Sequence, residues 1–252
     1  FVPSAEKREG YIRADPTHLL SVTKASFEAS QLIGTFEKPL YVKLEEALCA
    51  HSRAEQPACS NCLNVCPTGA ITSVGEHVAV DPMVCAGCGS CSAVCPSGAI
   101  SYDAPSIDTI FRRLTTLAST YKKLSRISPH LLVHDAVYGL EMISLAARFG
   151  RGLPAHVIPL EVDALSAFGH AEMVAALACG FEHVDILVTP KSELNVLEDQ
   201  KELAHALAGV DAVSLLQLTD PDDLSEKLYN LDKATISCSA IYGNYYVSVV
   251  PT

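Results

Sequence analysis

The feature that most constrains this chain is a run of closely spaced cysteines. Eight of its ten cysteines lie between Cys49 and Cys95. The last four follow the pattern C-x2-C-x2-C-x3-C-P, which starts at Cys85 and ends at Pro96. Thiolates are soft donors that suit iron, and spacings of two residues let the backbone wrap around a cube and direct its N–H groups at the sulfides. The run therefore predicts a [4Fe–4S] site.

The preceding cysteines repeat this pattern less regularly. Both runs contain the segment C-x2-C-x3-C-P-x-G-A-I, which starts at Cys59 in the first and at Cys88 in the second. The position that should match Cys85 is occupied by Gln56. An internal repeat of this kind indicates a duplicated half.

A candidate for the missing cysteine lies further upstream. The residues before Cys49 (L-E-E-A-L) and before Cys85 (V-D-P-M-V) share an apolar, an acidic, two variable and an apolar residue. We therefore predict that Cys49 is the counterpart of Cys85, displaced by a loop inserted before Cys59. If Cys49 is not a ligand, the first cluster would be a [3Fe–4S] centre or would take an outside ligand such as His51. A solvated position in the loop is the ordinary expectation for that histidine.

With these residues the chain resembles the bacterial two-cluster ferredoxin family over about residues 40–103. The resemblance implies two [4Fe–4S] clusters, in which the fourth cysteine of each run reaches across to the other cluster. One cluster would be held by Cys49, Cys59, Cys62 and Cys95. The other would be held by Cys66, Cys85, Cys88 and Cys91.

Other uses of the cysteines fit the sequence less well. A zinc site would show two cysteine pairs with a longer interval, not four cysteines that end in Cys-Pro. A disulfide framework suits a secreted domain, whereas the second half of the chain looks intracellular. No apolar run reaches the twenty or so residues needed to span a membrane. We therefore expect a cytoplasmic protein.

The charge of the chain limits its partners. The formal net charge is −11 at pH 7, and oxidised clusters with their thiolates would make it more negative. Such a chain is a poor nucleic-acid binder, because nucleic acids are themselves negative. It suits docking to a basic patch on a redox partner, although an ordinary acidic protein would carry the same charge.

Four segments follow one another along the chain. We expect a helical lead-in at 1–39, the cluster module at 40–103, a connecting helix at 104–127 and an α/β domain at 128–252. In the last segment, strand-like runs at 131–135, 155–161, 184–189 and 212–218 alternate with helical segments at 138–149, 169–179, 191–208 and 221–231. This alternation predicts a parallel sheet with helices on its faces.

The α/β segment contains no recognisable catalytic motif. It lacks G-x-G-x-x-G, the phosphate-binding G-x-x-x-x-G-K-S/T and the G-x-S-x-G nucleophile elbow. His134-Asp135 ends the first strand, where open α/β sheets bind ligands. Further polar residues are scattered at His156, Glu161, Asp163, His170 and Glu172. We expect these to be surface or structural groups, and Cys179 and Cys238 to be core or near-surface thiols.

A second resemblance covers about Arg148 to Pro190. The segments R-F-G-R-G-L-P-A-H-V-I-P-L-E-V and G-H-A-E-M-V-A-A-L-A-C-G-F-E-H-V-D-I-L-V-T-P are similar to the delta subunit of methyl-viologen-reducing hydrogenases. Where that family carries cysteines for a [2Fe–2S] cluster, this chain has E-V-D and T-P. The resemblance therefore implies a fold and a redox context without a third cluster. The combination of segments also resembles multi-ferredoxin proteins associated with formate dehydrogenase.

Together these features predict an α+β ferredoxin-like two-cluster module followed by an α/β domain with a parallel sheet. The expected function is the relay of single electrons through two [4Fe–4S] clusters to or from a redox protein or dehydrogenase. An alternative is a redox-responsive or structural adaptor whose α/β domain binds a partner. A third alternative is an enzyme whose active site the sequence does not reveal.

Overall fold

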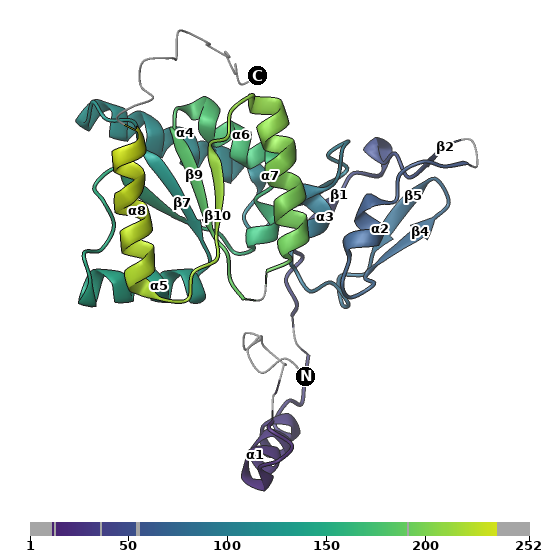
Figure 1. The fold of residues 1–252 in the computed structure, drawn as a ribbon. Coiled ribbons are helices and arrows are strands. Elements are labelled where there is room, and N and C mark those ends of the chain that lie inside the picture. The colour runs from purple at the N-terminus through teal and green to yellow at the C-terminus, as the bar shows by residue number, and fades with distance from the viewer. Residues whose placement is uncertain (1–11, 13, 36, 54–55, 191, 236–252) are drawn as a thin grey trace. The chain divides into compact units, whose positions relative to one another are not determined.

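The computed structural model describes residues 12–235 except 13, 36, 54–55 and 191 (Figure 1). The chain divides into two compact units, Phe1–Pro39 and Leu40–Thr252. The first unit contains helix α1, Leu19–Ser30, which has no buried residue. Within the described part of the chain, no helix combines the length and the apolarity needed to cross a membrane.

The cysteine module is built from two short antiparallel ribbons. Strand β1 (Val42–Leu44) pairs with β6 (Ile100–Tyr102), and β4 (Ile71–Val74) pairs with β5 (His77–Val80). β6 follows the second cysteine run but pairs with the strand that precedes the first run. The other ribbon lies within the chain between the runs. Each ribbon therefore joins the end of one cysteine run to the segment that leads into the other.

Short helices carry the central cysteines. Helix α2 (Asn61–Val65) and helix α3 (Ser90–Ala93) start soon after the C-x2-C segments begin, and the 3₁₀ helix η1 (Glu46–Leu48) leads into the first cysteine. Gly89 precedes α3 with a φ of 78°, a left-handed conformation that glycine adopts without strain. The inserted loop forms a ribbon that the sequence did not predict, in which β2 (Ser52–Arg53) pairs with β3 (Gln56–Pro57).

The second part of this unit confirms the prediction of an α/β domain with a parallel sheet. The sheet has the order β10-β9-β7-β8, and all its neighbours are parallel. Its strands are β7 (His130–His134), β8 (Val157–Glu161), β9 (His183–Leu187) and β10 (Val213–Leu216). The connecting helix is α4 (Ile107–Leu124), and the other helical elements are α5 (Tyr138–Phe149), η2 (Leu165–Ala167), α6 (His170–Cys179), α7 (Leu194–Ala208) and α8 (Pro221–Thr235).

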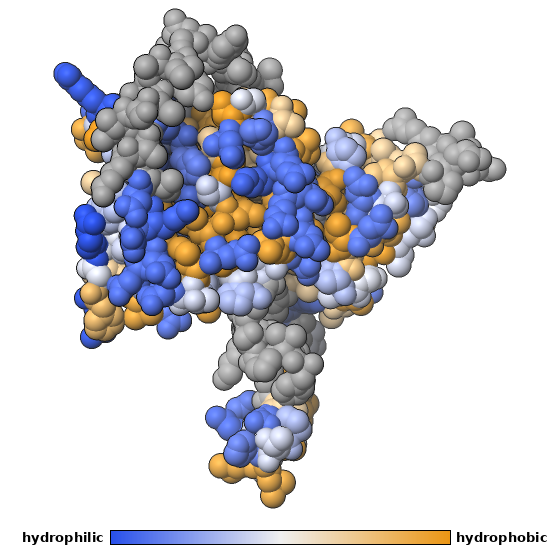
Figure 2. Space-filling model, in the orientation of Figure 1, coloured by the Kyte–Doolittle hydropathy of each residue, from blue (hydrophilic) through white to orange (hydrophobic). Residues whose placement is uncertain are grey.

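Helices cover both faces of the sheet, as Figure 1 shows. Leu131 and Val133 of β7 belong to a core that includes residues of α4, α6 and α7. Leu132, between them, belongs to a second core with residues of α5 and α8. Successive strand residues point to opposite faces, so a continuous apolar strand serves both cores. On the outside, Figure 2 shows hydrophilic side chains along α7 and α8, with hydrophobic ones between these helices.

Glycine and aspartate residues mark several helix ends in the α/β domain. Gly180 and Gly209 end α6 and α7 in the left-handed conformation, as expected of C-terminal glycines. The carboxylate of Asp220 accepts the backbone N–H of Asp222 at 2.9 Å, just inside α8. Gly150 also follows a helix, but its φ of −118° is not left-handed.

The cysteine module packs closely against the α/β domain. Helix α3 of the module contacts η2 of the domain. A Cβ atom at Gly89 would overlap that of Ala167, and a Cβ atom at Gly169 would lie 3.0 Å from that of Ala93. Two glycines therefore permit this approach, one from each side of the contact.

Candidate functional site

The structure brings the eight clustered cysteines together as two groups of four. The first group lines one cavity and consists of Cys49, Cys59, Cys62 and Cys95. The second group lines another cavity and consists of Cys66, Cys85, Cys88 and Cys91. Each group combines three cysteines of one run with the last cysteine of the other. These are the two sets that the resemblance to two-cluster ferredoxins implies.

Backbone hydrogen bonds explain why Cys49 reaches the first group. It lies four residues after Glu45, whose backbone N–H donates to the carbonyl of Ala99 at 2.8 Å. In the other half, the N–H of Asp81 donates to the carbonyl of Ala70, also at 2.8 Å, and a cysteine again follows four residues later. The repeat is therefore present in the fold as well as in the sequence, and it places Cys49 despite the inserted loop.

The inserted loop is held by His51, which is buried rather than solvated. Its Nδ1 lies 2.7 Å from the carbonyl oxygen of Cys59, and its Nε2 lies 2.7 Å from Oγ of Ser73. A carbonyl only accepts hydrogen bonds, so Nδ1 donates to it. In the neutral ring, Nε2 then accepts from the serine hydroxyl. Both nitrogens have protein partners, so His51 anchors the loop to β4 instead of standing ready as an iron ligand.

One thiol in each group is strongly buried. Burial, followed by the charges of the other three cysteines in its group, raises the pKa of Cys62 to about 11. Burial and then the charges of its own group and of Cys62 raise the pKa of Cys91 to about 12. These thiols resist ionisation without a cation between them. Bound iron would offset both causes, because coordination deprotonates a thiol.

The last cysteine of each run has a different environment. Burial acts to raise the pKa of Cys66, but hydrogen bonds from the Thr68 hydroxyl and from backbone N–H groups outweigh it, and the pKa is lowered. The pKa of Cys95 is lowered against burial in the same way, by backbone N–H groups and the Ser97 hydroxyl. The Sγ–Oγ distance is 3.7 Å in both halves. Such donors stabilise negative charge on a cluster ligand.

The donor set fits an iron–sulfur cluster. Each cavity is lined by four cysteines, which is the ligand set of a [4Fe–4S] cluster. The residues present therefore fit that cofactor.

Comparison with known families agrees with this chemistry. Residues 57–99 match the 4Fe-4S dicluster domain. The match identifies a ferredoxin-like iron–sulfur module that serves electron transfer. The matched segment begins after Cys49, so the placement of that cysteine rests on the geometry of the fold. Neither the curated proteins nor the solved structures contain a match to this chain.

Two of the polar residues singled out in the α/β domain have structural roles. The carboxylate of Asp135 accepts the backbone N–H groups of Tyr138 and Gly139, at 3.1 and 2.6 Å. It therefore caps the start of α5. The neighbouring His134 is buried and its Nδ1 lies 2.9 Å from the Asp135 carbonyl. Glu161 is exposed at the end of β8.

His156 belongs to a buried cluster that the sequence did not reveal. Its ring meets that of His130 edge-on, with 4.7 Å between the centroids. His183 lies 5.8 Å from His130 by the same measure, and its Nε2 is 3.4 Å from the fully buried carboxylate of Asp185. The cluster forms where β7 and β9 begin. Three separate segments supply it, so no local pattern could have predicted it.

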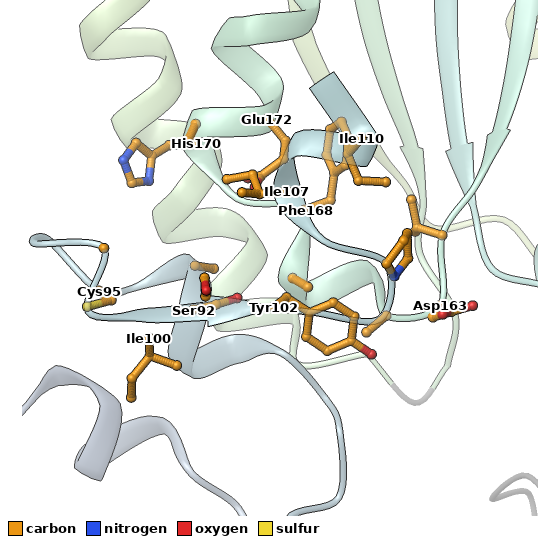
Figure 3. Close-up of a pocket in the computed structure, with 18 residues that line it drawn as sticks. Ser92, Cys95, Ile100, Tyr102, Ile107, Ile110, Asp163, Phe168, His170 and Glu172 are labelled. Carbon is orange, nitrogen blue, oxygen red and sulfur yellow. The ribbon is translucent and has the colours of Figure 1, made fainter. Parts of the chain in front are cut away.

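Asp163, His170 and Glu172 line different parts of a third cavity (Figure 3). Cys95 of the module lines the same cavity. The sequence singled out these polar residues without a motif to join them, and the fold places them around the same cavity as a clustered cysteine. The other two cysteines are apart from the site. Cys179 is half-buried, and Cys238 lies outside the described residues.

Proposed function

We propose that this protein relays single electrons through two [4Fe–4S] clusters to or from a redox enzyme. In this proposal the first cluster is held by Cys49, Cys59, Cys62 and Cys95. The second is held by Cys66, Cys85, Cys88 and Cys91. The supporting observation is the pair of cavities, each lined by four cysteines in the crossed arrangement of three and one.

The residues of the chain account for the properties of such a relay. When bound, each cluster takes up or releases one electron at a time. Backbone N–H groups and the hydroxyls of Thr68 and Ser97 hold the negative charge on the crossing cysteines. Cys62 of the first group and Cys91 of the second belong to the same buried core cluster, so the two groups of thiols are neighbours. That closeness favours transfer between the clusters.

The proposed partner is a redox protein or a dehydrogenase. The net charge of −11 suits a partner with a basic docking surface. The resemblance of the chain to proteins associated with formate dehydrogenase makes that enzyme one candidate. Reduction of the clusters by purified formate dehydrogenase and formate, with a rate that falls as salt is added, would support it.

Anaerobic reconstitution tests the two-cluster proposal. We expect about eight irons and eight sulfides per chain, and an EPR spectrum of two interacting S = 1/2 centres after reduction. About four irons per chain, or tightly bound zinc, would contradict it. Clusters that cannot be reduced without unfolding the protein would favour the adaptor alternative instead.

A further inference from the structure

A cavity of about 360 Å³ lies between the cysteine module and the α/β domain. In Figure 3, Cys95, Ile100 and Tyr102 lie below His170, Glu172 and Phe168. The module contributes Cys95, Ile100 and Tyr102, and the domain contributes Phe168, His170 and Glu172, among others. Its size falls in the range of small-molecule sites, about 300–1,000 Å³. It also lies beyond the carboxyl end of β8, where open α/β sheets bind ligands.

Cys95 connects this cavity to the cluster site. The same residue lines the cavity of the first cysteine group and the cavity between module and domain. Ile100 likewise lines both. A molecule in the larger cavity would therefore touch a cysteine of the first group directly. That position suits a molecule that exchanges electrons with the cluster.

The walls favour an apolar molecule. Aliphatic and aromatic side chains supply much of the lining, including Ile107, Ile110 and Phe168. Ile110 and Phe168 are buried, and burying apolar ligand surface against such groups provides most of the binding energy in sites of this kind.

The charges at the cavity disfavour a nucleotide cofactor. Asp163 and Glu172 line it, and none of the described lining residues is a lysine or an arginine. A flavin nucleotide or a nicotinamide dinucleotide brings phosphates, which need cationic side chains or a glycine-rich loop. The sequence has neither phosphate-binding motif. A neutral ligand fits this lining better.

Two of the lining residues can handle protons. Nδ1 of His170 lies 2.6 Å from the amide oxygen of Gln200, which accepts its proton and leaves Nε2 to exchange one. The Glu172 carboxylate accepts the backbone N–H of Gly169 at 2.9 Å. Burial raises the pKa of Glu172, so this carboxyl holds a proton more readily than an exposed one.

We propose that this cavity binds a neutral quinone-type carrier that exchanges electrons with the cluster at Cys95. The inference rests on the proposed electron-transfer function. Conversion of a quinone to its hydroquinone takes two electrons and two protons. Two [4Fe–4S] clusters reduced by a redox protein would supply the electrons, one each, and would be reoxidised. The protons would come from solvent by way of His170 and Glu172.

Binding of duroquinone to the oxidised holoprotein tests the proposal. All ring positions of this quinone carry methyl groups, so free thiols do not add to it. Equilibrium dialysis should find about one site per chain. Ala171 is exposed and lines the cavity from α6, so Ala171→Phe should fill part of the cavity and weaken binding at least tenfold. Ala178→Phe, an exposed position on the same helix outside the cavity, should leave binding unchanged.

A second measurement uses the dithionite-reduced protein after the dithionite has been removed. One equivalent of duroquinone should restore the visible absorbance of the clusters, and Ala171→Phe should slow this step while Ala178→Phe does not. FMN should not bind.

The proposal is overturned if duroquinone fails to bind or if it binds equally well to Ala171→Phe. If that variant loses iron or helical content, Ala164→Leu, in the loop after β8 that also lines the cavity, carries the same expectation. Iron content and the EPR spectrum decide the electron-transfer function separately, because they need no quinone.

Discussion

The two halves of the cysteine module have the same backbone plan but different surroundings. Gly69 and Gly98, which follow the crossing cysteines, both have a φ of 66°. The residues between the paired cysteines differ. Ser60 and Asn61 in the first half are exposed, whereas Gly89 and Ser90 in the second half are buried. The first half faces solvent, and the second half supports the contact with the α/β domain.

This difference shows what a duplicated unit keeps and what it loses. The parts that position thiols are shared, because both groups of cysteines need the same geometry. The parts that face outward differ according to what covers them. Glycine at position 89 leaves room for Ala167. Ser60, at the equivalent position, is exposed and needs no such room. The variants below test this division in order of decreasing effect.

Equivalent cysteine replacements should have the largest effect. We expect Cys49→Ser and Cys85→Ser each to lower the iron content from about eight per chain to between about four and seven, through loss or conversion of one cluster. Conversion to a [3Fe–4S] centre would give its own EPR signal in the oxidised protein. Cys179→Ser, outside both groups, should keep all the iron. Full iron content and two unchanged clusters in Cys49→Ser would show that Cys49 is not a ligand.

The second largest effect should come from adding a methyl group where the cysteine module contacts the α/β domain. Gly89→Ala and Gly98→Ala both place alanine at a positive φ, but only the first meets a neighbour within 4 Å. We expect Gly89→Ala to destabilise the holoprotein by about 1–3 kcal/mol more than Gly98→Ala, because overpacking costs that much. Thermal unfolding of the two variants measures the difference. Equal unfolding temperatures for the two variants would mean that Gly89 and Ala167 are not in tight contact in solution.

Loss of the loop anchor should have a similar or smaller effect, confined to the first half. His51→Ala removes both hydrogen bonds and leaves the carbonyl of Cys59 without this donor, at a cost of about 1–3 kcal/mol. The first cluster should therefore be lost faster to an iron chelator, while the second is retained. His205→Ala, at an exposed site on α7, should behave like the unaltered protein. Equal loss of both clusters in His51→Ala would contradict a role restricted to the loop.

The smallest effect should come from the hydroxyls beside the crossing cysteines. Thr68→Val and Ser97→Ala each remove a donor that favours negative charge. The reduced cluster carries the extra charge, so its reduction potential should fall by roughly 20–60 mV, the equivalent of one modest hydrogen bond. Potentiometric EPR titration should show the change at the second cluster for Thr68→Val and at the first for Ser97→Ala. A change at the opposite cluster would contradict the crossed assignment.

Local sequence patterns explain which helices and strands could be predicted and which features of the fold could not. The sequence predicts a helix over 138–149 between two strand-like runs, and α5 has the same bounds. The parallel sheet followed from alternating strand-like and helical runs. The strand order β10-β9-β7-β8 did not, since it depends on which strands meet after long connections.

The sequence by itself predicted the chemistry of the cysteine module. Spacing and repetition marked eight cysteines, because cluster ligands recur at short intervals, and the resemblance to two-cluster ferredoxins implied how they divide into two sets. Only the tertiary structure decided the burial of His51 and the cavity that Cys95, His170 and Glu172 line together. These arrangements join segments far apart in the chain, and their contacts come from packing between the two parts, which no local pattern records.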